Sequence, residues 1–238
     1  MSLLNIDINS LNYESSPFPH IIIDNILTEK CLDNILIEVN NLNNRYADGV
    51  FCDSNSPYEF NKFAFNKNLP SNLKNLFIEL TSRNFIQKLE KLTGINGIIS
   101  DSLELQGAGV HRIENKGFLQ IHTDFNTYHD NIYGKLDRRI NLLIYLNPKW
   151  DEKYKGHLWL CDKHTKKCVK KISPILNRCV IFNTTNNSLH GHPESLNVPD
   201  NIKRHSIALY YYTKNINQNT DFEGDSEHNT LWHFDIKE

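Results

Sequence analysis

The periodicity of the apolar residues changes once along this chain, close to Gly94. Before this point, apolar side chains recur at the three- and four-residue spacing of amphipathic helices. After it they alternate with polar side chains, as in half-buried strands, and no convincing helical pattern follows for roughly the next hundred residues. Helices followed by strands, without regular alternation of the two, predict a mainly β fold with flanking helices (α+β).

Three helices are predicted in the first part of the chain, after a short strand at Ile21–Ile23. The first follows Thr28, a plausible N-cap, and the second begins at Pro70-Ser71. The third covers residues 82–92, and Gly94 lies where a helix C-terminus favours glycine. The aromatic-rich stretch 46–70 is predicted to be an irregular loop, which either forms a lid or pocket wall or packs on the helices.

The second part of the chain contains eight predicted strands, many of them bounded by Gly, Pro, Asn or Asp. They cover residues 97–105, 108–114, 117–124, 138–146, 156–161, 166–172, 178–183 and 204–213. This number and spacing favour a sandwich or jelly roll. Longer connections are expected at 125–137 and 184–203. A polar tail follows, in which Leu231 to Phe234 could dock back on the body.

Composition excludes several function classes. The 238 residues suit one domain, and 39% hydrophobic and 11% aromatic residues are enough for a core. A net charge of −2 gives no reason to expect nucleic acid or an anionic membrane as a partner. The sequence shows no signal peptide and no membrane-spanning stretch. Five cysteines without a Cys-x-x-Cys motif indicate reduced thiols and a cytoplasmic location. The basic run Lys163–Lys171 is interpreted as a solvated hairpin.

A His-x-Asp triplet within a predicted strand suggests a metal site. His122 and Asp124 are two residues apart, so both side chains point to the same side of the strand. Gln120 is expected on that face too. His190 or His192 can supply a third ligand. Two histidines and one carboxylate on one face of an octahedron are typical of non-haem Fe(II) oxygenases, although a zinc site could use the same ligands.

Two further strands carry groups suited to binding a carboxylate. Arg204 and Ser206 are again two residues apart, and a guanidinium with a hydroxyl can donate several hydrogen bonds to one carboxylate. The alternative for Arg204 is a solvated position on an edge strand. Tyr145 lies in an apolar run, and its hydroxyl needs a partner if it is buried, either a bound carboxylate or a backbone carbonyl.

Several motifs occur in an order that resembles the 2-oxoglutarate- and Fe(II)-dependent dioxygenases, in particular the prolyl-4-hydroxylase-like branch. They include His-Thr-Asp-Phe-Asn at 122–126, the Arg-Arg-Ile-Asn run at 138–147, the strand at 177–182, His-Gly-His-Pro-Glu at 190–194 and Arg-His-Ser at 204–206. The resemblance covers residues 17–213. It implies a double-stranded β-helix (jelly roll) with helices packed on one sheet.

The resemblance also implies ligands and roles. His122, Asp124 and His190 would bind Fe(II), with His190 preferred over His192. Arg204 would pair with the distal carboxylate of 2-oxoglutarate, helped by Tyr145 and Ser206. O2 would be the other co-substrate, and ascorbate a possible reductant. Because halogenating relatives lack the carboxylate, Asp124 favours hydroxylation. The chain departs from many relatives at Lys155-Gly156, where they have Gly-Gly, and in the longer loop 191–203.

We therefore expect an Fe(II)/2-oxoglutarate hydroxylase with succinate and carbon dioxide as co-products. The expected substrate is a prolyl residue in a protein or peptide. A free amino acid or other small metabolite is the first alternative, and a non-catalytic jelly-roll binding module is the second. The expected organisation is a lead-in at 1–16, a dioxygenase domain at 17–213 and a tail at 214–238. Within the domain, residues 17–95 are helical and 96–213 form the jelly-roll core. Sequence alone does not predict an oligomeric state.

Overall fold

The structure, a computed structural model, describes residues 2–7, 11, 13–100, 107–214 and 226–238. Its helices are α1 (Glu29–Asn41), α2 (Ser71–Thr81) and α3 (Arg83–Thr93), with short 3₁₀ helices at Asn44–Tyr46 and Glu152–Tyr154. Its strands are β1 (His20–Asp24), β2 (Gly49–Phe51), β3 (Glu59–Phe65), β4 (Gly109–Thr123), β5 (Thr127–Asp130), β6 (Gly134–Tyr145), β7 (Leu158–Asp162), β8 (Lys167–Ile172), β9 (Arg178–Asn183), β10 (Leu189–His192), β11 (Arg204–Lys214) and β12 (Leu231–Trp232).

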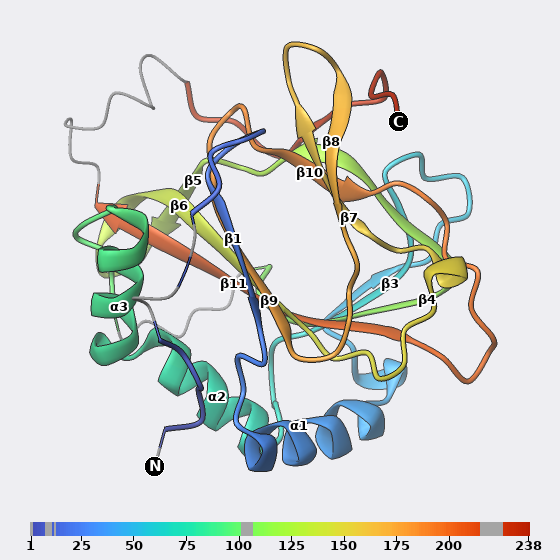
Figure 1. Ribbon diagram of the computed structural model, residues 1–238, viewed down its shortest axis with the longest axis horizontal. Coiled ribbons are helices and arrows are strands. Elements are labelled where there is room, and N and C mark those ends of the chain that lie inside the picture. Colours follow the sequence, from blue (N-terminus) through green and yellow to red (C-terminus); the bar gives the residue numbers. More distant parts are fainter. Residues whose placement is uncertain (1, 8–10, 12, 101–106, 215–225) are drawn as a thin grey trace.

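The strands form one curled antiparallel sheet. Its main path runs β1-β9-β6-β11-β4-β10-β7-β8, with β3 and β12 also pairing with β4, β2 with β3 and β5 with β6. Figure 1 shows that the β1-β9-β6-β11 half lies across the molecule from the β10-β7-β8 half. This arrangement confirms the predicted jelly roll. The long strand β4 belongs to both halves, since it pairs with β11 near its start and with β10 near its end.

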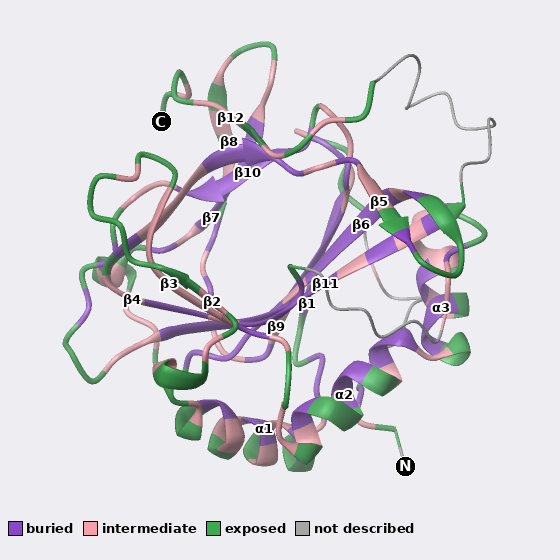
Figure 2. Cartoon of the chain, turned by 180° about the vertical axis from the view of Figure 1, so that it is seen from behind, coloured by how far each residue is buried: buried purple, intermediate pink, exposed green. Residues whose placement is uncertain are grey.

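The three helices lie outside the β1-β9-β6-β11 half, as Figure 1 and the view from behind in Figure 2 both show. Each helix buries one apolar stripe and leaves the other side in solvent. Ile35 of α1, Leu76 of α2 and Ile86 of α3 are fully buried. Gly94 ends α3 with a φ of +73° and donates its N–H to the carbonyl of Glu90. The predicted helices and the predicted C-terminal glycine are therefore confirmed.

Strand β6 shows how one apolar run serves two sides of the sheet. Ile140, Leu142 and Ile144 face the helices and join the largest hydrophobic cluster. The alternating residues Asn141 and Tyr145 face the interior of the jelly roll, where they line a cavity. Strand β9 divides in the same way. The helices thus cover the outer face of the sheet, and the inner face carries both an apolar cluster and the polar side chains of the cavity.

The predicted loop at 46–70 is wrong in part, because it contains β2 and β3. Strand β3 pairs with β4 along its whole length, but the register shifts between Phe60 and Lys62. Asn61, at the shift, has a φ of +46°. Between these two pairs β3 has one residue and β4 has four, and this interruption breaks the two-residue alternation by which a strand is recognised. The aromatic residues of β3 therefore do not follow a single period.

Other boundaries also differ from the prediction. The strands expected at 108–114 and 117–124 are one strand, β4, with an irregularity at Lys116, whose φ is +64°. The connections expected at 125–137 and 184–203 contain β5 and β10. The strand expected at 97–105 lies mostly outside the described residues, and Ile98 forms only an isolated bridge with Thr213. The basic run 163–171 does lie in the β7–β8 hairpin, as predicted.

The predicted docking of residues 231–234 on the body is confirmed. Leu231 and Trp232 form β12, which pairs with the end of β4. Of the tail expected at 214–238, residues 215–225 lie outside the described part of the chain. Within the described residues, no helix is long and apolar enough to cross a membrane.

Candidate metal and co-substrate site

Three side chains from two adjacent strands converge inside the jelly roll. His122 lies near the end of β4, Asp124 immediately follows that strand, and His190 lies in β10 directly opposite His122. The Nε2 atom of His122 is 3.6 Å from Oδ1 of Asp124, and Nε2 of His190 is 3.4 Å from Oδ2. One donor atom from each of the three residues lies within 4.8 Å of the others, and all three side chains are buried. The structure thus brings together the three ligands predicted from the sequence.

A backbone hydrogen bond orients each imidazole. Nδ1 of His122 lies 2.8 Å from the carbonyl of Gln120, and Nδ1 of His190 lies 2.9 Å from the carbonyl of Ser188. A carbonyl accepts only from a protonated nitrogen, so Nδ1 carries a proton in each ring and Nε2 is the nitrogen directed at Asp124. Glu194, the last residue of the motif at 190–194, is not this acceptor, and its carboxylate lies 3.8 Å from Nζ of Lys155.

An irregular register at the end of β4 corrects one sequence expectation. His190 pairs with His122, but His192 pairs with Leu119, so β4 has one more residue than β10 in this interval. Leu119 consequently lines the cavity, whereas Gln120 donates from Nε2 to the carbonyl of His233. Strict alternation predicted Gln120 on the face of His122. The extra residue places it on the other face. Gly191 permits the close approach of the two strands, since a Cβ there would lie 2.7 Å from the carbonyl oxygen of Gln120.

A buried arginine that sequence reasoning missed pairs with the carboxylate. Arg138 is 1% exposed, and its guanidinium lies 3.0 Å from Oδ2 of Asp124. Asn141 accepts from Arg138 and donates to the same carboxylate oxygen at 2.7 Å. Burial alone would raise the pKa of the Asp124 carboxyl, but Arg138 and the two histidines hold this pKa well below its usual range. The carboxylate is thus charged and fixed in orientation. The sequence did contain a signal for this residue, because two consecutive arginines, Arg138 and Arg139, begin an otherwise apolar run.

The state of His190 also suits a metal ligand. Burial lowers the pKa of His190 to about 4, although the Asp124 carboxylate acts in the opposite direction. The imidazole is therefore neutral at physiological pH, as coordination requires. His192, the rival third ligand, is buried as well, and burial and Arg204 hold its pKa well below the ordinary value. It lines the same cavity but does not converge with His122 and Asp124.

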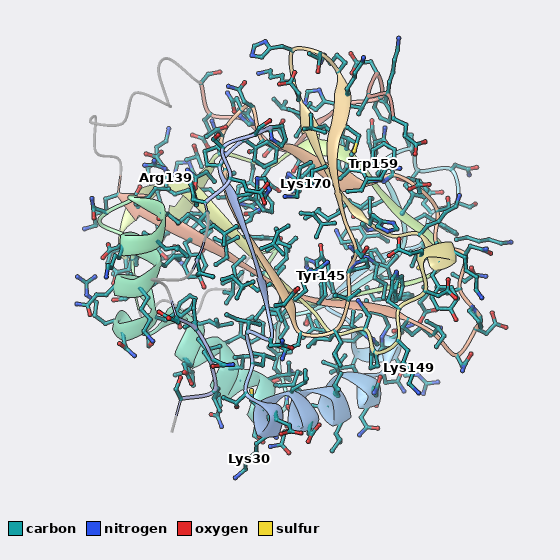
Figure 3. All side chains as sticks on the ribbon, viewed as in Figure 1. Lys30, Arg139, Tyr145, Lys149, Trp159 and Lys170 are labelled. Atoms are coloured by element: carbon teal, nitrogen blue, oxygen red, sulfur yellow. The ribbon has the colours of Figure 1, made fainter. Side chains whose placement is uncertain are left out.

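The second polar cluster lies farther along the cavity. Arg204 of β11 is 4% exposed, and its Nε donates to the carbonyl of Gly156 at 2.8 Å. Its guanidinium carbon lies 5.0 Å from the centre of the Tyr145 ring. Tyr145 pairs with Ser206 across β6 and β11. The cavity, of about 210 Å³, is lined by all three side chains and by the three converging residues. Figure 3 shows Tyr145 in the interior of the jelly roll.

This cluster contains a buried hydroxyl without a hydrogen bond and a buried guanidinium that donates to one backbone carbonyl. The hydroxyl of Tyr145 is buried without a hydrogen bond to any described residue. Burial also raises its pKa. No carboxylate in the described part of the chain pairs with Arg204. Buried polar groups are normally satisfied, because leaving one unpaired costs about 1–3 kcal/mol. Neither the solvated edge position considered for Arg204 nor the backbone carbonyl considered for Tyr145 is what the structure shows.

Lys155 and Gly156, where many relatives have Gly-Gly, form the turn whose Gly156 carbonyl accepts from Arg204. Gly156 has a φ of +74°, and a Cβ there would lie 2.5 Å from Leu196 and 3.1 Å from Arg204. Lys155 has a φ of +61° and a ψ of −145°, a conformation close to one that is essentially restricted to glycine. Lys155 thus adopts a conformation that favours glycine, at a strain of roughly 1–3 kcal/mol.

The fold and the converging residues define a class of protein: a jelly roll with a buried His-Asp-His cluster and a second, cationic cluster in one cavity. Residues 108–212 match the sequence profile of the 2OG-Fe(II) oxygenase superfamily. No curated protein matches the chain. The sequence-based resemblance is confirmed over residues 108–212 by the superfamily match. Solved structures that share the fold confirm the jelly roll.

Three solved structures illustrate this similarity. A prolyl hydroxylase from Trichoplax adhaerens, in complex with a hypoxia inducible factor peptide, is 20% identical with a TM-score of 0.56, covering 82% of this chain and 83% of its own. A Pseudomonas putida prolyl-4-hydroxylase is 11% identical with a TM-score of 0.56, covering 83% and 93%. HygX from Streptomyces hygroscopicus, with nickel and 2-oxoglutarate bound, is 10% identical with a TM-score of 0.52, covering 92% and 94%. At these identities the likeness concerns the fold.

The superfamily implies Fe(II), 2-oxoglutarate and O2, and the residues present fit these groups. Two imidazoles and a carboxylate suit Fe(II), and no fourth His, Cys, Asp or Glu of the described residues joins the cluster, so coordination positions remain for other ligands. The Tyr145 hydroxyl, which has no hydrogen bond, and the Arg204 guanidinium, which donates only to the Gly156 carbonyl, suit one carboxylate of a dicarboxylic acid.

Proposed function

We propose that this protein is an Fe(II)- and 2-oxoglutarate-dependent dioxygenase that hydroxylates an unactivated C–H bond of a prolyl residue in a protein or peptide. The co-products are succinate and carbon dioxide. One observation carries the proposal: a buried His122-Asp124-His190 cluster shares its cavity with an arginine that has no carboxylate partner among the described residues and with a buried tyrosine hydroxyl that forms no hydrogen bond to them. A metal ligand set and a carboxylate receptor in one cavity match the needs of this chemistry.

Each residue has a role that follows from its surroundings. His122, Asp124 and His190 hold Fe(II), and Arg138 keeps Asp124 ionised and in place. Arg204 and Tyr145 bind the distal carboxylate of 2-oxoglutarate, and Ser206 lies next to Tyr145 to donate a further hydrogen bond. Bound Fe(II) supplies the activation of O2. Ascorbate serves as reductant. The prolyl substrate is supported by prolyl hydroxylases among the proteins that share the fold.

The test is iron-dependent formation of succinate from 2-oxoglutarate under air, with and without proline-containing peptides. His122→Ala should abolish turnover with little loss of fold, because it removes a ligand that points into a cavity. His164→Ala, in the exposed turn of the β7–β8 hairpin, is the matched control and should behave as the native protein does. Retained turnover in His122→Ala would remove this residue from the metal site.

The same experiment separates the proposal from its rivals. Activity with Fe(II) but not with Zn(II) distinguishes the oxygenase from a zinc enzyme. Iron binding without succinate, across a broad panel of substrates, would instead favour a non-catalytic binding module. Stimulation by a peptide supports a prolyl substrate.

One observation favours the alternative of a free amino acid as substrate. Glu59 and Lys62 line the cavity as an ion pair of 2.7 Å, and both side chains are less than 20% exposed. Opposite charges side by side could receive the ammonium and carboxylate groups of an amino acid. Under this alternative, Glu59→Gln would raise the KM for the amino acid by about tenfold. A peptide substrate with blocked termini would be insensitive to this change.

A further inference from the structure

The last described residues of the chain form part of the wall around the candidate metal site. β12 pairs with β4 so that Leu231 lies opposite Thr123 and Trp232 opposite His122. The next residue, His233, donates its N–H to the carbonyl of Ile121. On the same stretch of β4, the N–H of Gln120 bonds to the carbonyl of Tyr58, just before β3. β12 thus continues along β4 from the point where the pairing with β3 ends.

This register decides where the side chains of β12 point. Directly opposed residues of an antiparallel pair share one face, so Trp232 lies on the face of His122. The centres of the two rings are 5.2 Å apart. Tyr58 also packs against the indole, at 5.0 Å between ring centres. Trp232 lines the cavity, whereas its neighbour Leu231 points outward and is 43% exposed.

Polar contacts fix the segment on both sides of Trp232. Before it, the side chain of Asn126 donates to the carbonyl of Ser226 and accepts from the N–H of His228. After it, the N–H of Cys168 in β8 bonds to the carbonyl of Lys237. The segment 226–238 therefore spans from the β5 side of the jelly roll to the β7–β8 hairpin. In Figure 2, β12 lies on the side of the molecule opposite the helices.

The part of the cavity lined by Trp232 belongs neither to the His122-Asp124-His190 cluster nor to the Arg204 cluster. Arg204 pairs with Ile113, which lies before the irregularity of β4 at Lys116, whereas Trp232 pairs with His122 beyond it. The Trp232 side of the cavity therefore presents a flat, rigid apolar surface beside the metal ligands. Such a surface favours a saturated ring or an aliphatic chain over a charged group.

We propose that Trp232, presented by β12 and supported by Tyr58, is a specificity-determining residue that receives the saturated carbon ring or chain to be oxidised. This inference rests on the proposed function. It assigns that role to a residue outside the superfamily match, which ends at residue 212. The active site is then incomplete in a chain that stops where the match stops.

Tryptophan fluorescence tests the placement of Trp232 independently of turnover. In a protein with Trp150→Phe and Trp159→Phe, Trp232 is the only indole. Ni(II), which prefers the same imidazole and carboxylate ligands, is titrated in with 2-oxoglutarate. We expect strong quenching of Trp232 emission, and weak quenching when Trp150 is the only indole instead. Ni(II) binding seen by calorimetry, without a change in Trp232 emission, would overturn the placement.

Substrate kinetics test the role. With an acetylated, amidated Gly-Ala-Pro-Ala-Gly peptide as probe, Trp232→Ala should raise the peptide KM by about tenfold or more. Trp232→Phe, which keeps a ring, should stay within about threefold of the native protein. Leu231→Ala is the matched control in the same strand and should leave the KM unchanged. Trp232→Leu replaces Trp232→Ala if the latter does not fold. A Trp232→Ala protein with the KM of Leu231→Ala would overturn the inference.

Two further readouts separate this inference from the proposed function. Calorimetric affinities for Ni(II) and 2-oxoglutarate should be alike in the native protein and in all β12 variants. If the native protein binds neither, the proposed function fails. If it binds both and forms iron-dependent succinate, but the peptide has no effect, the prolyl substrate and the Trp232 inference fail while the oxygenase reaction stands.

Discussion

Two buried arginines lie on adjacent rungs of the same pair of strands and face opposite ways. Arg112 of β4 pairs with His205 of β11, and Arg204 pairs with Ile113. Arg112 points toward α1 and Arg204 into the cavity, and their exposed fractions are 6% and 4%. Their hydrogen bonding is nonetheless different.

The guanidinium of Arg112 has a protein partner on every nitrogen. It donates from Nε to His205, from Nη1 to the carbonyl of Leu42 and the side chain of Asn44, and from Nη2 to the carbonyl of Val39. Two of these acceptors are carbonyls at the C-terminal end of α1, where positive charge is favourable. Arg204 makes one such bond, to Gly156. A saturated buried arginine supports the fold, and an unsaturated one is suited to bind an anion.

Replacing Arg112 should have the largest effect on stability. Arg112→Met leaves several buried acceptors without a donor, so the free energy of unfolding should fall by about 3–5 kcal/mol. Urea denaturation measures this change. The 2-oxoglutarate affinity of the folded fraction should remain that of the native protein. A loss of co-substrate affinity larger than the loss of stability would contradict the division between the two arginines.

Replacing Arg204 should have the reverse pattern. Arg204→Met should weaken 2-oxoglutarate binding by about 1.5–3 kcal/mol, because a charge-assisted hydrogen bond is lost, and should affect iron binding far less. Stability in the absence of ligand should change little or increase, since a buried charge without an anionic partner is removed. Calorimetric titration gives the affinity and urea denaturation the stability. An unchanged co-substrate affinity would remove Arg204 from the site.

The Arg112 side of the sheet should also make stability depend on pH. Burial and the neighbouring Arg112 lower the pKa of His205 to about 3. As pH falls, the His205 imidazole is therefore protonated in the unfolded chain before it is protonated in the folded one. The contribution of neutral His205 to stability is lost as pH falls below about 6.5. Between pH 6.5 and 5 the loss is about 2 kcal/mol. His205→Gln, which can still accept from Arg112, should flatten the decline by that amount. An identical decline in both proteins would show that His205 is not buried in its neutral form.

The smallest effects come from two buried tyrosines. The hydroxyl of Tyr211 donates to the carbonyl of Leu80 at 3.0 Å, whereas that of Tyr145 has no partner among the described residues. Tyr211→Phe should therefore lower stability by about 1 kcal/mol. Tyr145→Phe should leave stability unchanged or raise it, while weakening 2-oxoglutarate binding by about 1 kcal/mol. Equal destabilisation by the two changes would mean that the Tyr145 hydroxyl is satisfied in the free protein.

The parts of the site that could be predicted are those set by local spacing. His122 and Asp124 are two residues apart in sequence, as are Arg204 and Ser206, and strand geometry places each pair on one side. The three helices and the glycine after α3 follow from equally local patterns. The choice of the third ligand required the resemblance to known oxygenases. His190 and His192 are two residues apart, so local spacing does not distinguish between them.

The remaining features depend on pairing between distant segments. The extra residue in β4 turns Gln120 away from the cavity, and no local signal marks it. Arg138 acquires its role only when β6 passes beside Asp124. Trp232 reaches His122 through a pairing that spans more than a hundred residues, which sequence periodicity does not encode. Strand β3 escaped prediction because the shift at Asn61 breaks its alternation.

The attachment of β12 to the edge of β4 has a consequence for how such a protein can diversify. The residues that would hold iron and 2-oxoglutarate come from strands in the interior of the sheet, whereas Trp232 comes from a short terminal strand at its margin. Mutations in this terminal strand can reshape the pocket without disturbing the ligand-bearing strands. Substrate range and oxidative chemistry would therefore be free to evolve at separate rates within one small protein.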